Sequence, residues 1–108
     1  MKWSVTYDFS ARQELKEIGE YIRDVLQEPN TAKKQVQRIR KAANSLNHFP
    51  LRHRVYEHEP WRSRAVRVLP VDNYLIFYHP NESTHIVTIL HILYGPMNIP
   101  DQLDEAAE

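Results

Sequence analysis

The stretch Tyr74-Leu-Ile-Phe-Tyr78, followed after Pro80-Asn-Glu-Ser83 by Thr84-His-Ile-Val-Thr-Ile-Leu-His-Ile-Leu-Tyr-Gly95, decides the fold. Both apolar runs are rich in β-branched and aromatic residues, which favour strands, and the four residues between them are turn formers. The sequence therefore predicts a β-hairpin. Its second strand, 84–94, is long and largely apolar, which indicates a central strand that is buried on both faces along part of its length.

A third strand is predicted just upstream, over Ser63–Val71, where apolar residues recur with the alternation of a half-buried strand. Asp72-Asn73 are typical turn residues and connect this strand to the hairpin. The preceding residues 51–62 are irregular, with room for a short strand near Val55–His58. The C-terminal half of the chain is therefore expected to be mostly sheet.

The N-terminal half carries the pattern of two helices. The first is predicted to start at Ser10, because Ser10 and Gln13 have the spacing of a capping box. Pro29-Asn30 breaks the chain, and Asn30 is expected to cap a second helix over about 31–48. Phe49-Pro50 ends that helix, since the residue before a proline avoids helical geometry.

The two predicted helices form an antiparallel hairpin, because the connection between them is short. Gly19 lies inside the first helix, where it costs about 1 kcal/mol relative to alanine, and close approach of the second helix explains it. With a first strand over residues 2–7, the expected fold is α+β: a small, twisted, mainly antiparallel sheet packed against an N-terminal helical hairpin, in the order β-α-α-β-β-β. The residues expected to pack on the sheet are Leu15, Ile18, Ile22, Val36, Ile39, Ala43 and Leu46.

Length and composition limit the class of protein. The 108 residues suit one domain, expected over 1–100, followed by an acidic tail over 101–108 that forms a frayed helical turn or stays disordered. There is no cysteine, which excludes disulfides and thiolate metal sites and fits a reducing cytoplasm. No apolar run reaches the roughly 20 residues of a membrane span, and no signal peptide is evident.

Charge is distributed unevenly although the formal net charge is zero. Residues 30–71 contain ten lysines and arginines against Glu57 and Glu59, a balance of +8. This excess predicts an anionic partner, either nucleic acid or an acidic protein segment, against the alternative that the charges only solvate the surface.

Two groups of residues are candidates for chemistry. Arg52-His-Arg54 and Trp61-Arg-Ser-Arg64 mix aromatic and guanidinium groups, which suits phosphate contact and base stacking. The alternative is a solvated loop in which Trp61 covers the core. Among the six histidines, His91 is a candidate general base if it faces a cleft, and otherwise a hydrogen-bonded core residue. No pair has the spacing of a helical metal site, so neither a metal nor a cofactor is predicted.

The order and spacing of several blocks resemble the RelE/ParE superfamily, the toxins of bacterial type II toxin–antitoxin pairs, and the ParE branch in particular. The blocks are Ala11…Leu15…Ile18…Tyr21-Ile22, Leu46…Phe49-Pro50, Val68…Tyr74–Tyr78 and Ile89…His91-Ile-Leu-Tyr-Gly95. The resemblance covers nearly the whole chain up to about residue 100. It implies a cytoplasmic toxin whose fold is the one expected above.

RelE-type members are ribosome-dependent, metal-independent ribonucleases that cut mRNA. The resemblance implies an arginine where this chain has Leu75, and Arg-Arg-Asp where it has Pro96-Met97-Asn98. Losing one group that stabilises transition-state charge costs roughly 3 kcal/mol. If the chain is such an enzyme, the candidate catalytic residues are Arg64, Arg67, His91 and Tyr94.

ParE-type members instead inhibit DNA gyrase, and the resemblance to this branch is favoured by Leu75, by the Tyr74–Tyr78 strand and by the two long helices. The missing Arg-Arg-Asp is a departure from both branches. A RelE-like mRNA interferase acting on the ribosome and a degenerate toxin that only binds its antitoxin are the alternatives. The family implies a cognate antitoxin as partner and a toxin–antitoxin hetero-oligomer. An acidic, amphipathic antitoxin segment is expected to dock across the helical hairpin and residues 52–67, on Arg38, Arg54, Trp61, Arg62 and Arg64.

Overall fold

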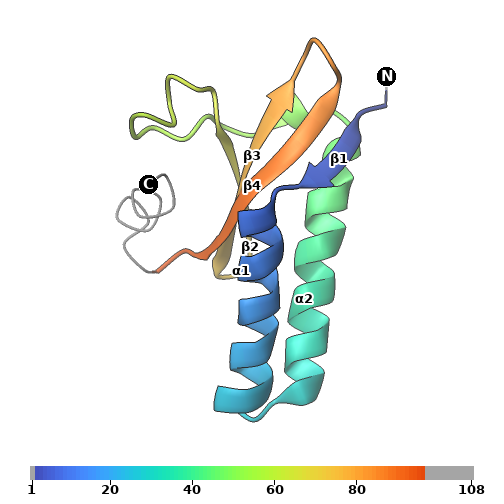
Figure 1. Ribbon diagram of the computed structural model, residues 1–108, viewed down its shortest axis with the longest axis vertical. Helices are drawn as coiled ribbons and strands as arrows, with labels where there is room; N and C mark the ends of the chain where they lie inside the picture. The colour runs from blue at the N-terminus through green and yellow to red at the C-terminus, as the bar shows by residue number, and fades with distance from the viewer. Residues whose placement is uncertain (1, 97–108) are drawn as a thin grey trace.

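The computed structural model describes residues 2–96 and has the predicted α+β architecture (Figure 1). A short strand leads into two long helices, and three further strands follow after an irregular segment. The elements are β1 (Ser4–Tyr7), α1 (Phe9–Glu20), a π-helical turn (Tyr21–Val25), α2 (Pro29–Asn44), β2 (Arg67–Val71), β3 (Tyr74–Asn81) and β4 (Ile86–Tyr94). The expected acidic tail and Met97-Asn98 lie outside the described residues.

The four strands form one sheet in the order β1-β4-β3-β2, so that β4 is central, as predicted. β1 runs parallel to β4, with Ser4 opposite Ile86, and the other two pairs are antiparallel. Phe77 pairs with His91 but Tyr78 pairs with Ile89, which leaves Leu90 as an extra residue in β4. This bulge switches the face on which the following side chains of β4 lie.

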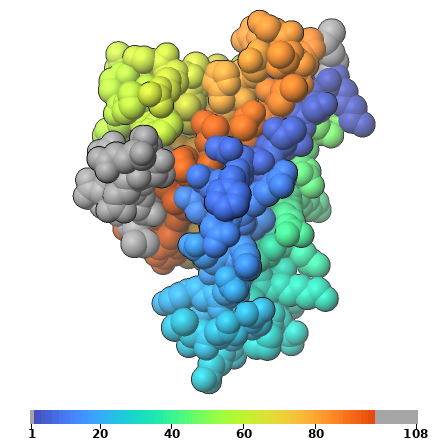
Figure 2. Space-filling model, in the orientation of Figure 1, coloured from blue at the N-terminus to red at the C-terminus, as the bar shows by residue number. Residues whose placement is uncertain are grey.

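The helical hairpin covers one face of the sheet and projects beyond it (Figures 1 and 2). Of the seven predicted packing residues, five are buried. All of these except Ile22 belong to one buried cluster, against which Ile18 and Val36 pack while partly exposed. A Cβ added to Gly19 would lie 3.1 Å from Cγ2 of Val36. The predicted close approach of the helices at Gly19 is therefore confirmed. The five buried residues are Leu15, Ile22, Ile39, Ala43 and Leu46.

The opposite face of the sheet has a smaller core of its own. Successive side chains of a strand point to opposite faces, so Val68 packs in this cluster while Leu69 packs under the helices. An irregular segment, residues 56–66, supplies the cover. The cluster consists of Tyr56, Trp61, Val66, Val68, Phe77 and Leu93, and Leu75 and Leu90 pack against it.

Both predicted helix caps are wrong. The helix α1 begins at Phe9 after Asp8, and the side chain of Gln13 donates to Glu17 at 3.2 Å instead of reaching back to Ser10. The helix α2 begins at Pro29, whose fixed φ suits a first helical position, so the proline starts the helix that it was expected to precede. The regular α-helix also ends earlier than predicted, at Asn44, and continues as a 3₁₀ turn.

The predicted strand Ser63–Val71 is too long. Residues 59–65 form turns, in which the Glu59 carboxylate accepts hydrogen bonds from the backbone N–H of Ser63 at 3.2 Å and its hydroxyl at 2.6 Å. Ala65 has φ of 57°, which an extended strand cannot contain. The expected short strand near Val55 is a single bridge to Arg67. None of the helices within residues 2–96 is long and apolar enough to cross a membrane.

Candidate functional site

Glu14 joins the first helix to the central strand. The parallel partner β1 ends at Tyr7, opposite Ile89, so the remainder of β4 lacks a strand on that side. There the Glu14 side chain supplies the acceptor that a neighbouring strand would otherwise supply: its Oε1 accepts a hydrogen bond from the backbone N–H of Ile92 at 3.0 Å. Nδ1 of His91 lies 3.1 Å from Oε2 of the same carboxylate. One side chain thus satisfies two donors of β4.

The contact between Glu14 and His91 is the arrangement in which a carboxylate orients an imidazole. The His91 side chain is 8% exposed, and the ring meets Trp61 edge-on with centroids 6.1 Å apart. His91 is therefore a hydrogen-bonded core residue, the alternative that the sequence analysis left open. Glu14 was not among the predicted site residues, although a signal was present in the sequence: Glu14 lies three residues after Ala11 and four before Ile18, within the apolar face of α1.

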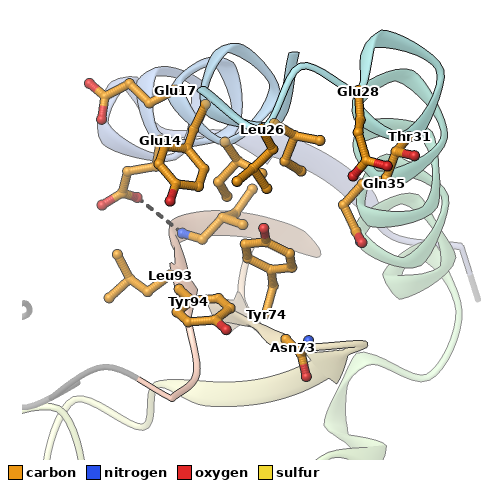
Figure 3. Close-up of a pocket in the computed structure, with 14 residues that line it drawn as sticks. Glu14, Glu17, Leu26, Glu28, Thr31, Gln35, Asn73, Tyr74, Leu93 and Tyr94 are labelled. Atoms are coloured by element: carbon orange, nitrogen blue, oxygen red, sulfur yellow. Dashed lines mark hydrogen bonds between the residues drawn. The ribbon is translucent and has the colours of Figure 1, made fainter. Parts of the chain in front are cut away.

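A groove of about 690 Å³ lies between the helical hairpin and the end of the sheet (Figure 3). Tyr74 and Tyr94 stand side by side in it, with ring centroids 5.6 Å apart. Burial raises the pKa of Tyr74, and the neighbouring phenols of Tyr94 and Tyr21 raise it further. The apolar part of the lining is formed by Ile18, Ile22, Leu26, Ile92 and Leu93.

The charge of this groove is negative. Its lining includes Glu14, Glu17 and Glu28, and among the described residues that line it there is no lysine, arginine or histidine. Its rim exposes large apolar side chains, with Tyr21 at 54% and Leu26 at 49%. The π-helical turn ends here, where the N–H of Leu26 bonds the carbonyl of Tyr21 at 3.1 Å. The groove thus combines an apolar floor with carboxylates.

A second groove, of about 520 Å³, lies on the hairpin and has the opposite charge. Gly19, Ala32 and Val36 line its bottom. One acidic residue, Glu20, and five basic residues line this groove. The basic residues are Arg12, Lys16, Arg23, Lys33 and Arg40. This adds a basic surface on α1 and α2 to the one predicted for residues 52–67.

The residues predicted to bind a partner are divided between two places. Arg62 and Arg64 are exposed on the irregular segment 56–66, Arg54 is exposed just before it, and the Arg62 guanidinium lies 3.3 Å from the Glu59 carboxylate. Trp61 is only 7% exposed, and the guanidinium carbon of Arg64 lies 5.3 Å from the centroid of its ring. Arg64 is therefore more accessible to a partner than Trp61.

Arg38 lies apart from that segment, on α2. Its guanidinium bonds the Asp72 carboxylate in the β2–β3 turn at 2.8 Å, and Gln35 bonds the same carboxylate at 3.0 Å. These contacts tie the second helix to the edge of the sheet. Arg38 thus has a structural contact in addition to any role in binding.

The four candidate catalytic residues are placed differently from one another. Arg64 and His91 both contact Trp61. Arg67 is occupied elsewhere, because its Nη1 donates to the carbonyls of Leu51 at 3.1 Å and His53 at 2.7 Å. Tyr94 stands beside Tyr74 in the acidic groove. Within residues 2–96 no group of three or more side chains is arranged to hold a metal ion.

The fold is similar to that of solved toxin–antitoxin proteins. A structure described as the chromosomal ParDE toxin–antitoxin system from P. aeruginosa matches with a TM-score of 0.71 and 22% identity, over 86% of this chain and 96% of that one. The RelBE2 toxin–antitoxin complex from Mycobacterium tuberculosis matches with a TM-score of 0.62 and 17% identity, over 87% and 99%. At these identities the likeness establishes the fold alone.

An archaeal RelE–RelB complex from Pyrococcus horikoshii OT3 has the same fold, with a TM-score of 0.52 and 15% identity over 91% of this chain and 100% of that one. No curated protein matches the sequence. The family model for the ParE toxin of type II toxin–antitoxin systems, parDE, matches residues 5–99. The predicted resemblance to the RelE/ParE superfamily is thereby confirmed, and the chain belongs to the ParE toxin family of type II toxin–antitoxin systems.

Proposed function

We propose that this chain inhibits DNA gyrase in the cytoplasm as a ParE-like toxin and that a cognate antitoxin neutralises it. The single observation that carries the choice of target is the side chain at position 75. A RelE-type ribonuclease is expected to have an arginine there, whereas Leu75 packs, partly buried, against the core on the loop-covered face of the sheet. Without that cation, charge developing on a phosphate loses a main source of stabilisation.

A RelE-like mRNA interferase is the second candidate, and the Glu14–His91 contact favours it. A carboxylate-oriented imidazole can act as a general base, and Arg64 lies on the same tryptophan that His91 touches. Against this, the His91 side chain is 8% exposed, which leaves little access for an RNA hydroxyl. A degenerate toxin that only binds its antitoxin is the third candidate.

The antitoxin is proposed to place an acidic segment on the basic surface of the toxin. Arg54, Arg62 and Arg64 are exposed there, and their charge would speed association at low ionic strength. The solved ParDE and RelBE structures of the same fold are described as toxin–antitoxin systems or complexes, which supports such a partner. The two proteins would form a hetero-oligomer.

Purified protein added to two assays in parallel tests the target. In gyrase supercoiling reactions we expect inhibition and accumulation of cleaved DNA, while ribosome-bound mRNA stays intact. The same preparation, first mixed with the product of the neighbouring reading frame, is the control and should leave gyrase active. Efficient mRNA cleavage with unaffected gyrase would overturn the proposal in favour of the ribonuclease. Silence in both assays from a folded protein that binds its antitoxin would identify a degenerate toxin.

A further inference from the structure

The acidic groove is a different kind of surface from the basic one to which the antitoxin is proposed to bind. It is formed where the end of α1, the start of α2, the start of β3 and the end of β4 meet (Figure 3). Tyr21, Leu26 and Tyr94 expose between 40% and 54% of their surface at its rim. Large apolar side chains gathered around one hollow are typical of a surface that a partner covers.

The carboxylates of the groove determine the charge of such a partner. Glu14 is already engaged with Ile92 and His91, whereas Glu17 and Glu28 are exposed on opposite sides of the hollow, one on α1 and one before α2 (Figure 3). Since no basic side chain is among the described lining residues, an acidic occupant would be repelled. A cationic occupant would find two carboxylates flanking an apolar floor.

The chain's own end does not fit this description. Residues 101–108 contain Asp101, Asp104, Glu105 and Glu108 and no lysine or arginine. They have the same sign of charge as the groove. These residues would be repelled from the groove, whose charge favours a cationic segment of a partner protein.

We infer that the acidic groove binds a cationic, amphipathic segment of the antitoxin. This inference rests on the proposed pairing with an antitoxin. The segment inserts apolar or aromatic side chains between Tyr21, Leu26 and Tyr94, and its lysines or arginines meet Glu17 and Glu28. Together with the acidic part proposed for the basic surface, this requires an antitoxin whose toxin-binding region has charges of both signs in separate blocks.

A matched pair of synthetic peptides tests the chemistry of the groove directly. Both are amphipathic 14-residue helices with the same leucines and one phenylalanine, and they differ only in having lysine or glutamate on the polar face. Fluorescence anisotropy with the full chain at low salt is expected to show binding of the lysine peptide that carboxylate reversal in the groove weakens, whereas any binding of the glutamate peptide to the basic surface should not be weakened by that reversal. No binding of the lysine peptide, or loss of both peptides in the same groove variant, would overturn the inference.

Substitutions then locate the binding. Glu17→Lys together with Glu28→Lys should weaken the lysine peptide about tenfold, because two attractions become repulsions. The matched control reverses two exposed carboxylates outside the groove, Glu57→Lys with Glu82→Lys, and should change affinity less than twofold. Leu26→Ser should weaken binding, whereas Phe9→Ser, which removes an exposed apolar side chain elsewhere on α1, should not. Equal effects of groove and control variants would overturn the inference.

The antitoxin complex separates this inference from the proposed function. With the neighbouring reading frame co-expressed, the Glu17→Lys/Glu28→Lys toxin should form a complex that dissociates at least about tenfold faster than that of the parent. An unchanged complex would refute the groove assignment while leaving the toxin–antitoxin pairing intact. Failure of the parent toxin itself to bind would refute both. Self-association of the toxin that the double reversal abolishes would assign the groove to a second copy and overturn the inference.

Discussion

The two faces of the sheet are covered in different ways. One carries the helical hairpin, whose Leu15, Ile39 and Leu46 pack in a continuous buried cluster. The other is covered by residues 56–66, which have no regular structure and contribute Tyr56 and Trp61 to a smaller cluster. The helical face supplies most of the packing, while the loop-covered face exposes the arginines proposed to contact the antitoxin. Stability and recognition are thus expected to respond to different substitutions.

The largest effect is expected for Ile39→Ala, on the helical face. Ile39 is fully buried, so its truncation leaves a cavity that the helices cannot fill without moving. We expect the free energy of unfolding to fall by about 2–4 kcal/mol. Urea denaturation of both proteins measures this difference. Lys34→Ala, at an exposed position of the same helix, is the control, and a loss below about 0.5 kcal/mol for Ile39→Ala would contradict the packing described here.

The same division explains what sequence reasoning could predict. The helical face follows a regular apolar spacing, so the hairpin, six of its seven predicted packing residues and the central position of β4 were predicted correctly. The helix starts were predicted wrongly because the capping preferences of Ser10 and Asn30 did not decide where the helices begin. The first helix begins directly after β1 and Asp8, and the second begins at Pro29, because proline itself suits the first position of a helix.

The loop-covered face has no period from which to predict it. The strand expected from Ser63 was broken by side-chain hydrogen bonds from Ser63 to Glu59 and by the left-handed conformation of Ala65, neither of which a pattern of apolar residues reveals.

Glu14 was missed for a related reason. Its partners are 77 and 78 residues away, so only the fold brings them together. Tyr94 was singled out, but the groove in which it lies was not, because the lining comes from both helices and from the sheet.

The next largest effect is expected for Glu14→Ala, which tests whether the carboxylate stabilises the open edge of β4. Removing it leaves the N–H of Ile92 and the ring of His91 without their acceptor in a largely buried position. The expected loss is about 1–3 kcal/mol of unfolding free energy, again by urea denaturation. Glu14→Gln keeps an oxygen acceptor and should lose less than half as much. Equal losses would show that the hydrogen bond to Ile92 contributes little.

On the loop-covered face, reversing Arg62 and Arg64 together to glutamate should change binding more than stability. Both side chains are exposed, so unfolding free energy should change by less than about 0.5 kcal/mol. Association with the antitoxin should slow by about tenfold at low salt, with a smaller difference at high salt because ions screen the charges. Stopped-flow fluorescence measures the rate. The proposed docking on this surface fails if affinity and association rate both stay unchanged at low salt.

Among the substitutions of buried residues, the smallest loss of stability at neutral pH is expected for Tyr78→Phe, in the cluster under the helices. The buried Tyr78 hydroxyl donates to the carbonyl of Pro50 at 2.6 Å, so its removal should cost about 0.5–1.5 kcal/mol.

Burial raises the pKa of Tyr78 to about 12, although Arg67 and Arg52 act in the opposite direction. The folded protein holds this proton more tightly than the unfolded chain, whose tyrosines have a pKa of about 10. The contribution of the Tyr78 hydroxyl to the free energy of unfolding is therefore complete below about pH 10. It is lost as the pH rises from about 10 towards 12. The difference in unfolding free energy between the parent and Tyr78→Phe, measured by urea denaturation at pH 8 and pH 11, should therefore shrink at the higher pH. A difference that stays constant would mean that the phenol ionises equally easily in the folded and unfolded states, and would contradict the raised pKa of Tyr78.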